Sequence, residues 1–228
     1  MASYPRILPA GDTALTVEFG DEIAPEIHDR VLAFASRVPA LNIAGIIEVV
    51  PTYRSVTVYA DSLQVDVSRL MDRLASEARN LTAFESGQGR CVEIPVLYGG
   101  EFGPDLTAVA AFAGRPMEEV IALHTSVTYR CYMLGFSPGF PYLGRVPDAI
   151  AMPRLSEPRA QVAGGSVGIA GIQTGIYPQS SPGGWRVIGR TPLRIYDPAR
   201  SQPFLISPGD RVRFVPISRK QFDDLVIS

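Results

Sequence analysis

The chain has 228 residues, of which 46% are hydrophobic and 19% charged, with a formal net charge of −2. This composition is typical of soluble globular proteins and excludes disordered and fibrous classes. Lys220 is the only lysine, and the arginines are scattered along the chain. They do not form the basic stripe that nucleic-acid binding requires.

Neither export nor membrane insertion is indicated by the sequence. The opening residues, MASYPRILPAGDTALTVEFG, have no apolar segment behind a basic start, and no run reaches the apolar length of a membrane span. Cys91 and Cys131 lack the spacing of a metal or redox motif. We therefore expect a cytoplasmic protein in which both cysteines are buried thiols.

The first part of the chain predicts an α+β domain. Apolar residues alternate in some runs, as in a strand, and recur with helical spacing in others. In the order strand, helix, strand, strand, helix and strand, the predicted elements are 13–20, 25–38, 43–51, 54–61, 65–80 and 92–96. This order is typical of a ferredoxin-like sandwich.

A polar, glycine-bearing stretch, Thr82–Arg90, marks the predicted boundary between a domain at 1–85 and a domain at 90–228. Two short helices are predicted after it, at 103–114 and 116–124. The remaining apolar runs, punctuated by glycine and proline, are 129–136, 165–171, 185–191, 193–197, 203–207 and 211–217. They predict a small β-barrel or sandwich.

Three Ser-Pro-Gly triplets, beginning at Ser137, Ser181 and Ser207, interrupt these runs. Proline followed by glycine fits the two central positions of a type II turn. For the third triplet, which leads directly into an apolar run, a plain structural turn is the favoured interpretation.

The segment 160–185 carries no charge and ends on Trp185, the only tryptophan of the chain. It contains GIAGIQTGIYPQSSPGGW, and glycines let a backbone approach a ligand closely. Long irregular segments of a small barrel are also where binding functions concentrate. Residues 164–185 therefore fit either a ligand-facing wall or neutral scaffold. Phe136, Phe140 and Tyr142 in the loop 134–144 likewise fit either a binding wall or plain core.

Catalytic groups are scarce in this part of the chain. Neither 120–147 nor 160–185 contains a carboxylate, which excludes a local carboxylate pair of the glycosidase kind. The phosphate loop GxxxxGK[ST] is absent from the sequence. Two histidines and two cysteines without ligand spacing predict no metal site. A lone histidine such as His124 fits a capping or packing role better than that of a general base.

The remaining polar, aromatic and glycine residues predict a binding cleft. Arginine suits a carboxylate or phosphate through its two-pronged guanidinium, so a small anionic ligand is expected. Gln173 both donates and accepts hydrogen bonds and is expected to orient a polar substrate. Gln173 and His124 are the candidate catalytic residues. The candidate substrate- or nucleotide-binding residues are Tyr129, Arg159, Gly165, Thr174, Tyr177, Trp185 and Arg190.

Long motifs along nearly the whole chain resemble the family of the 5-oxoprolinase B subunit, also known as allophanate hydrolase subunit 1, which includes a sporulation kinase inhibitor. The motifs are RILPAGDTALTVEFG, EVVPTYRSVTVYAD, GGEFGPDL, ALHTSVTYRCYMLGFSPGFPYLG, GGSVGIAGIQTGIYPQSSPGGWRVIGRTPLRIYD and SPGDRVRFVPI. Two small departures are Val162, where the family tends toward proline, and Cys131, where it tends toward an aliphatic residue.

This resemblance implies a ferredoxin-like domain followed by a cyclophilin-like barrel. It further implies an ATP-dependent enzyme that opens 5-oxoproline to glutamate, with ATP as co-substrate and magnesium in the full complex. The implied partners are the C and A subunits of 5-oxoprolinase, of which the C subunit is itself cyclophilin-like. Without them we expect the chain to be inactive. The neutral glycine-rich segment is then a wall of the substrate or interface cleft, which the partner completes. The alternative is a non-enzymatic regulator that docks on a sensor histidine kinase.

Overall fold

The computed structural model of the chain describes residues 3–81 and 89–227. The chain separates into two compact units, 1–88 and 89–228. The predicted boundary stretch falls largely on 82–88, which lies outside the described residues, so the domain limits 1–85 and 90–228 stay predictions. Among the residues that the structure describes, no helix is both long enough and apolar enough to span a membrane.

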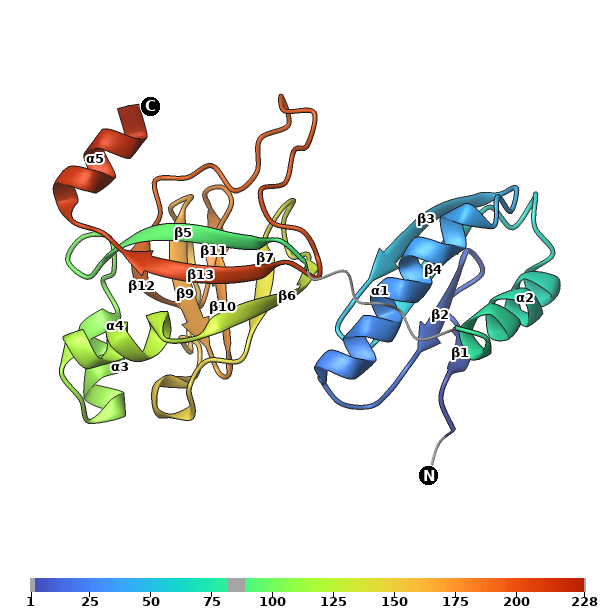
Figure 1. Cartoon of the computed structure of the whole chain (residues 1–228), viewed down its shortest axis with the longest axis horizontal. Coiled ribbons are helices and arrows are strands. Elements are labelled where there is room, and N and C mark those ends of the chain that lie inside the picture. The colour runs from blue at the N-terminus through green and yellow to red at the C-terminus, as the bar shows by residue number, and fades with distance from the viewer. Residues whose placement is uncertain (1–2, 82–88, 228) are drawn as a thin grey trace. The chain divides into compact units, whose positions relative to one another are not determined.

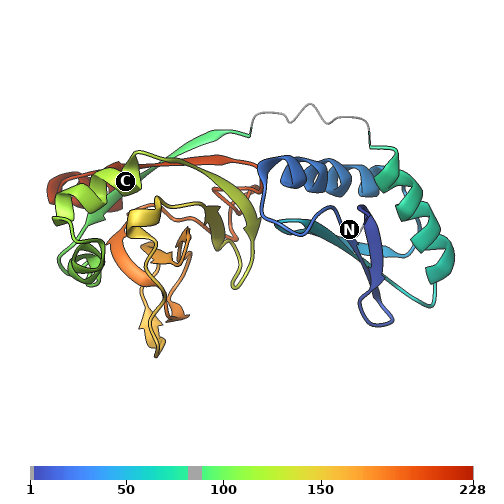
Figure 2. The same ribbon diagram turned by 90° about the horizontal axis from the view of Figure 1, so that it is seen from below.

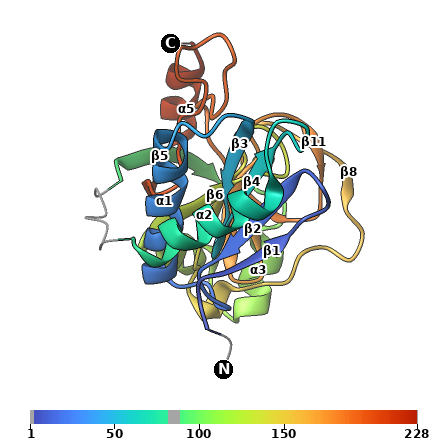
Figure 3. The same ribbon diagram turned by 90° about the vertical axis from the view of Figure 1, so that its right-hand side faces the viewer.

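The N-terminal unit is an antiparallel sheet of four strands in the order β1-β2-β4-β3, with two helices on one of its faces (Figures 1 and 2). Helix α1 packs on β3 and β4, whereas α2 packs on β1 and β2. In Figure 3, α2 lies toward the viewer and α1 lies to the left of the strands. The elements are β1 (Arg6–Pro9), β2 (Ala14–Glu18), α1 (Pro25–Ala40), β3 (Ile46–Pro51), β4 (Ser55–Ala60) and α2 (Val67–Arg79).

Apolar residues occupy every second position of the central strands, and this alternation decides which face of the sheet the helices cover. The buried residues of β2 and β4 on the helix side are apolar, and the helices supply apolar residues at the predicted helical spacing. These core residues are Leu15, Val17, Val56 and Val58 of the strands, Val31, Phe34 and Val38 of α1, and Leu70, Leu74 and Ala78 of α2. Helix α2 begins after Asp66, whose carboxylate accepts hydrogen bonds from the N–H groups of Ser68 and Arg69.

The predicted last strand of this sheet is wrong. Residues Cys91–Tyr98 form β5, which belongs to the C-terminal barrel. The fourth strand of the sheet is instead β1, which pairs antiparallel with β2 and places Ile7 opposite Val17. Strand β1 has four residues and ends in proline, so its alternation of apolar and polar residues is too short to be recognised from the sequence. Strand β1, which comes first in the chain, thus takes the edge position of the ferredoxin-like sheet that the predicted last strand was expected to fill.

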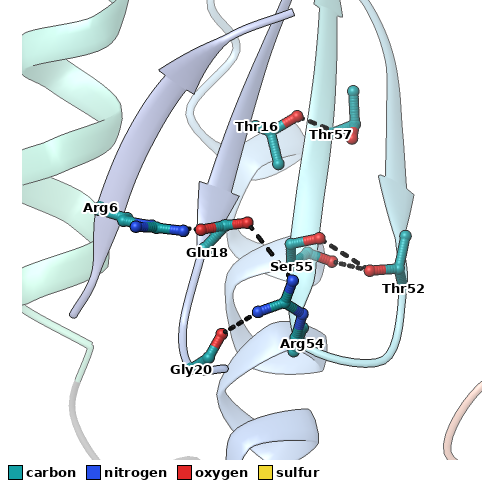
Figure 4. A network of polar contacts seen from close by, with 8 residues as sticks. All are labelled: Arg6, Thr16, Glu18, Gly20, Thr52, Arg54, Ser55 and Thr57. Carbon is teal, nitrogen blue, oxygen red and sulfur yellow. Dashed lines mark hydrogen bonds and ion pairs between the residues drawn. The ribbon is translucent and has the colours of Figure 1, made fainter. Parts of the chain in front are cut away.

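The other face of the sheet carries polar side chains (Figure 4). Arg6 on β1 forms an ion pair with Glu18 on β2. The second carboxylate oxygen of Glu18 lies 4.0 Å from the guanidinium of Arg54, which donates a hydrogen bond to the carbonyl of Gly20 at 3.1 Å. Surface ion pairs of this kind contribute about 0–1 kcal/mol each. Their main effect is to favour the observed pairing of β1, β2 and β4.

The C-terminal unit is a closed barrel with the strand order β10-β7-β6-β13-β5-β12-β9. Strands β5 and β13 run side by side and parallel (Figure 1), whereas the other neighbours are antiparallel. The barrel strands are β5 (Cys91–Tyr98), β6 (Thr128–Leu134), β7 (Pro141–Gly144), β9 (Ser166–Ala170), β10 (Gln173–Ile176), β12 (Arg186–Arg190) and β13 (Arg211–Pro216). The structure confirms the predicted α+β class with a C-terminal barrel.

A separate two-stranded ribbon and four helical segments complete this unit. The ribbon pairs β8 (Arg159–Val162) with β11 (Ser181–Gly183). The helices are α3 (Leu106–Ala113), α4 (Met117–Thr125), the 3-10 turn η1 (Asp148–Ile150) and α5 (Arg219–Ile227). Helices α3 and α4 confirm the two helices predicted after the boundary. Gly114, in the left-handed conformation at φ 63°, ends α3.

Two predicted strands of the barrel are wrong. Residues 193–197 and 203–207 are not strands and meet only in an isolated bridge between Tyr196 and Phe204, whose rings stack with centroids 5.4 Å apart. The triplet at Ser181 also departs from prediction, because it forms β11 instead of a type II turn. Cys91 is exposed and only Cys131 is buried, which corrects the expectation of two buried thiols.

Asp210 connects the first and last strands of the barrel. It is 5% exposed, and its carboxylate accepts hydrogen bonds from the backbone N–H of Arg90 at 3.0 Å and of Ser207 at 2.9 Å. The guanidinium of Arg90 adds an ion pair at 2.8 Å. These contacts fix the residue before β5 against the turn that precedes β13.

We predict that Asp210→Ala lowers the free energy of unfolding by about 1–3 kcal/mol, because two backbone N–H groups lose their acceptor. Denaturant unfolding followed by circular dichroism measures the change. Glu93→Ala is the matched control, since Glu93 pairs with Arg213 across the same two strands but is exposed, and its loss should cost less than about 1 kcal/mol. Equal decreases in the free energy of unfolding of the two variants would contradict this account of Asp210.

Candidate functional site

Glycines of the neutral segment lie directly beneath aromatic rings. A Cβ added at Gly175 would lie 3.0 Å from the ring of Phe140, and one added at Gly183 would lie 2.2 Å from the hydroxyl of Tyr177. The distance at Gly175 is tighter than almost all real Cβ contacts, and the distance at Gly183 is shorter than real Cβ atoms show. The glycines at these two positions are therefore required by the close packing of aromatic side chains on the backbone of β10 and β11.

These rings surround a pocket of about 390 Å³, which we call the aromatic pocket. Phe140 is the central ring of this aromatic cluster, with its ring centroid 5.2 Å from those of Tyr177 and Trp185 at interplanar angles of 85° and 79°. Such edge-to-face contacts are the favoured geometry of aromatic pairs. The lining residues are Phe136, Phe140, Tyr142, Arg154, Pro158, Tyr177, Pro182, Gly183, Gly184 and Trp185.

Arg154 is the one charged side chain in this lining. It is exposed, and within the described part of the chain it has neither an ion pair nor a hydrogen bond of its side chain. Its backbone is nevertheless fixed at the pocket. The N–H of Leu155 donates to the carbonyl of Gly184 at 2.7 Å, and Nε of Arg186 donates to the carbonyl of Pro153 at 3.1 Å. The backbone on both sides of Arg154 is thus fixed at the pocket, while its guanidinium is exposed and unpaired among the described residues.

Phe136 at the pocket is both exposed and strained. It is 62% exposed, and its φ of 62° places a bulky residue in the left-handed region. This conformation costs about 1–2 kcal/mol for a residue other than glycine. The turn is held by hydrogen bonds from the N–H of Ser137 to the carbonyl of Gly135 at 2.7 Å and from the N–H of Phe140 to that of Ser137 at 3.0 Å. Strain of this kind tends to occur at functional sites.

Of the predicted site residues, Tyr177 and Trp185 lie in the aromatic pocket. Burial raises the pKa of the Tyr177 hydroxyl, while a hydrogen bond from the backbone of Trp185 and the charge of Arg159 act in the opposite direction. Tyr177 is therefore neutral at physiological pH and serves as a wall and hydrogen-bonding group.

Arg159 is occupied by an internal partner. Its guanidinium makes two hydrogen bonds to the carboxylate of Asp105, at 2.9 and 2.7 Å. Asp105 is 6% exposed and also accepts a hydrogen bond from the N–H of Val187 at 2.7 Å. The expectation that Arg159 binds an anion is not supported by this geometry, because both prongs of its guanidinium are already filled. The pair joins β8 to β12 and to the start of α3.

Arg190 and Gly165 lie at a different pocket. Nε of Arg190 donates to the carbonyl of Gly164 at 2.9 Å, and both Arg190 and Gly165 line a cavity of about 350 Å³ that also includes Arg194. Gly165 has φ 82°, and its N–H donates to the carbonyl of Tyr177 at 2.7 Å. This second cavity shares no lining residue with the aromatic pocket.

Three further predicted site residues form a network inside the barrel. His124, Tyr129 and Thr174 have no exposed surface. Nδ1 of His124 lies 2.8 Å from the hydroxyl of Tyr98, and its Nε2 lies 2.9 Å from the hydroxyl of Thr174. The Tyr129 hydroxyl donates to the backbone carbonyl of His124 at 2.7 Å. These residues belong to the core of the barrel. This corrects the prediction that Tyr129 and Thr174 line a binding cleft.

The network determines the proton positions on His124. The Thr174 hydroxyl donates to the carbonyl of Gly168 at 2.9 Å, so it accepts from Nε2–H, and Nδ1 then accepts from Tyr98. Burial lowers the pKa of His124 to about 3. The imidazole is therefore neutral and cannot reach a substrate outside the barrel. A catalytic role for His124 stays a prediction that this burial weighs against.

Gln173 begins β10, opposite Ala170 of β9, and is not part of the lining of the aromatic pocket. Its predicted catalytic role stays a prediction. Within residues 3–81 and 89–227, no group of three histidine, cysteine, aspartate or glutamate residues is arranged to hold a metal ion.

Comparison with known proteins gives consistent matches. Residues 5–206 match the family described as carboxyltransferase domain, subdomain C and D. The 5-oxoprolinase B subunit of Bacillus subtilis is 45% identical, and the alignment covers 95% of this chain and 95% of that protein. The protein of the same name from Escherichia coli O157:H7 is 43% identical over 90% of this chain and 93% of its own. The protein of the same name from Haemophilus influenzae is 41% identical, over 92% of this chain and 97% of its own.

Solved structures share the fold. The crystal structure of TTHA0988 matches 90% of this chain with a TM-score of 0.80 and 40% identity, and this chain spans 40% of that longer one. A conserved uncharacterized protein from Pyrococcus horikoshii is 46% identical with a TM-score of 0.58, over 95% of this chain and 100% of its own. The urea amidolyase of Kluyveromyces lactis, at 22% identity and a TM-score of 0.79, covers 97% of this chain, which spans 15% of it. That last likeness shows the fold alone.

We predict that Gly183→Ala lowers stability by about 1–3 kcal/mol, the usual cost of overpacking, because the new methyl group meets the Tyr177 hydroxyl. Gly184→Ala is the matched control, since a Cβ there would lie 3.7 Å from its nearest neighbours and its φ is not in the positive region. We expect the control to be neutral or slightly stabilising. Thermal unfolding compares the two, and a larger loss in Gly184→Ala would contradict the packing described here.

We also predict that His124 does not titrate in the folded protein between pH 8 and 5. Its pKa falls from 6.5 in the unfolded chain to about 3 on burial, so its contribution to stability is complete above pH 6.5 and is lost as the pH falls toward 3. Below pH 6.5 this residue alone should remove about 1.4 kcal/mol per pH unit. Ring C–H signals in NMR measure the titration, and a midpoint near 6.5 for His124 would contradict the burial.

Proposed function

The chain belongs to the family of the 5-oxoprolinase B subunit, and we propose that it is the B subunit of an ATP-dependent 5-oxoprolinase, which opens 5-oxo-L-proline to L-glutamate. The observation that carries this proposal is similarity along nearly the full length of both this chain and three relatives that bear that name. The solved structures support the same two-part fold.

We propose that the chain acts together with the C and A subunits of 5-oxoprolinase. Hydrolysis of an amide requires groups that give and take protons at the reacting atoms. The aromatic pocket has Arg154 as its charged group and no carboxylate or histidine in its lining. His124 is enclosed in the barrel and remains neutral. The acid–base groups are therefore expected from a partner.

ATP is the proposed co-substrate of the complete enzyme. The part of this chain that the structure describes contains no cluster of three metal-ligating side chains, and the sequence contains no phosphate loop. These residues do not fit a dedicated magnesium site, and we assign no step to magnesium in this chain. Nucleotide contacts by Arg190 or Gly165 stay a prediction.

We propose that this chain binds and orients the substrate, with the aromatic pocket as the candidate site. The walls of the pocket are rigid rings packed on backbone, and rigid walls hold a reactant in one orientation at a low entropic cost. Tyr177 and Trp185 are the members of the sequence-predicted set that meet there.

We predict that the purified chain alone releases no glutamate from 5-oxoproline and ATP above background. With the C and A subunits of the same organism, glutamate release should appear, and it should stop when either ATP or this chain is left out. An enzyme-coupled glutamate assay measures all four mixtures. Hydrolysis by the chain alone would contradict the need for partners, whereas no glutamate from the complete mixture would contradict the proposed function.

A further inference from the structure

We propose that the aromatic pocket binds the cyclic amide itself, with the flat ring between the aromatic walls and the carboxylate of the substrate on Arg154. This inference rests on the proposed function for the identity of the ligand. It assigns binding roles to Phe136 and Arg154.

The positive charge in the lining supports the binding of a carboxylate in this pocket. Arg154 is its single charged lining residue, and its guanidinium has no partner among the described residues. Arg159, by contrast, has its guanidinium filled by Asp105. A guanidinium donates two parallel hydrogen bonds to a carboxylate. The segment of Arg154 is held at the pocket by the hydrogen bond from the N–H of Leu155 to the carbonyl of Gly184 and by that from Nε of Arg186 to the carbonyl of Pro153.

Size and shape support a small flat ring. The pocket volume of about 390 Å³ lies within the range of small-molecule sites. The ring of Phe140 stands at steep angles to those of Tyr177 and Trp185. Phe140 and Tyr177 are buried, so the accessible aromatic surface of the pocket comes from Phe136, Tyr142 and Trp185. The backbone of Gly183 and Gly184 forms part of the lining, and the absence of side chains there leaves room for close approach.

The strained position of Phe136 supports contact with a ligand. Its ring lies 5.5 Å from that of Phe140 and 6.4 Å from that of Tyr177, yet 62% of the residue is exposed. Glycine would suit the φ of 62° better, so the aromatic side chain serves a purpose other than backbone stability. The exposed ring extends the walls of the pocket over a bound ring.

A side chain of a partner protein is the competing occupant of an apolar pocket. The unpaired guanidinium favours a ligand with a carboxylate, and the test separates the two occupants. We use the complex with the C and A subunits and measure KM for 5-oxoproline. We also measure inhibition by 2-pyrrolidinone, which has the same ring without the carboxylate.

Arg154→Gln should raise KM for 5-oxoproline at least about tenfold, the usual effect of losing hydrogen bonds to a charged group, and leave inhibition by 2-pyrrolidinone unchanged. Trp185→Ala should weaken the binding of both 5-oxoproline and 2-pyrrolidinone, because both ligands contain the ring. Arg145→Gln is the matched control, since Arg145 is an exposed arginine that pairs with Asp148 and does not line the pocket. It should change neither value.

Phe136→Gly separates a binding role from a structural one. We expect weaker binding of both ligands together with an equal or higher melting temperature, because glycine relieves the strained φ. A lower melting temperature that accounts for the loss of activity would overturn the role of Phe136 in binding.

Two results would overturn the assignment of the pocket while the proposed function stands. One is an unchanged KM in Arg154→Gln and Trp185→Ala. The other is loss of the complex with the C and A subunits on gel filtration, with normal KM in whatever complex remains. If the wild-type mixture releases no glutamate, the proposed function fails. Binding of 5-oxoproline to the full chain by saturation-transfer NMR then decides the pocket: loss in Arg154→Gln supports it, and absence of binding to the wild type overturns it.

Discussion

Aromatic rings packed on bare backbone are the constraint on which the candidate site depends. Phe140 and Tyr177 occupy the space that side chains at Gly175 and Gly183 would need, so these strands can be neither bulky nor charged. The ribbon of β8 and β11 carries Gly183, and the Asp105–Arg159 pair holds this ribbon against β12. Packing therefore accounts for the small, uncharged residues at these two positions of the segment 160–185.

The buried polar network and the aromatic pocket occupy different parts of the C-terminal unit. His124, Tyr98 and Thr174 satisfy one another in the interior, which keeps the imidazole neutral and the strands in register. The pocket lies among side chains of another cluster, with its own apolar centre at Phe140 and Tyr177. The lining of the pocket contains neither a carboxylate nor a histidine and is mostly aromatic rings and glycine backbone. This division suits a protein that orients a ligand for a partner.

The sequence predicted α1 to α4 because their apolar spacing is regular, but it did not predict the C-terminal helix α5. It missed β1, which is too short to show alternation, and it assigned β5 to the first domain because a lone strand carries no sign of its partner. Tyr177 and Trp185 were found because the uncharged segment stood out. Thr174 was misplaced because alternation does not distinguish the inside of a closed barrel from its outside wall. Arg154 gave no signal, since its position depends on contacts with Gly184 and Arg186 that only the fold creates.

The position of β13 also governs how the barrel is completed during synthesis. In the strand order it lies between β5 and β6, which are made first and have no direct pairing with each other. Until residues 211–216 leave the ribosome, β5 and β6 each present an unpaired edge, and such edges can join those of other nascent chains. The barrel closes only when its last strand inserts between the first two. A premature stop before this strand would therefore leave an open, aggregation-prone sheet instead of a smaller version of the same domain.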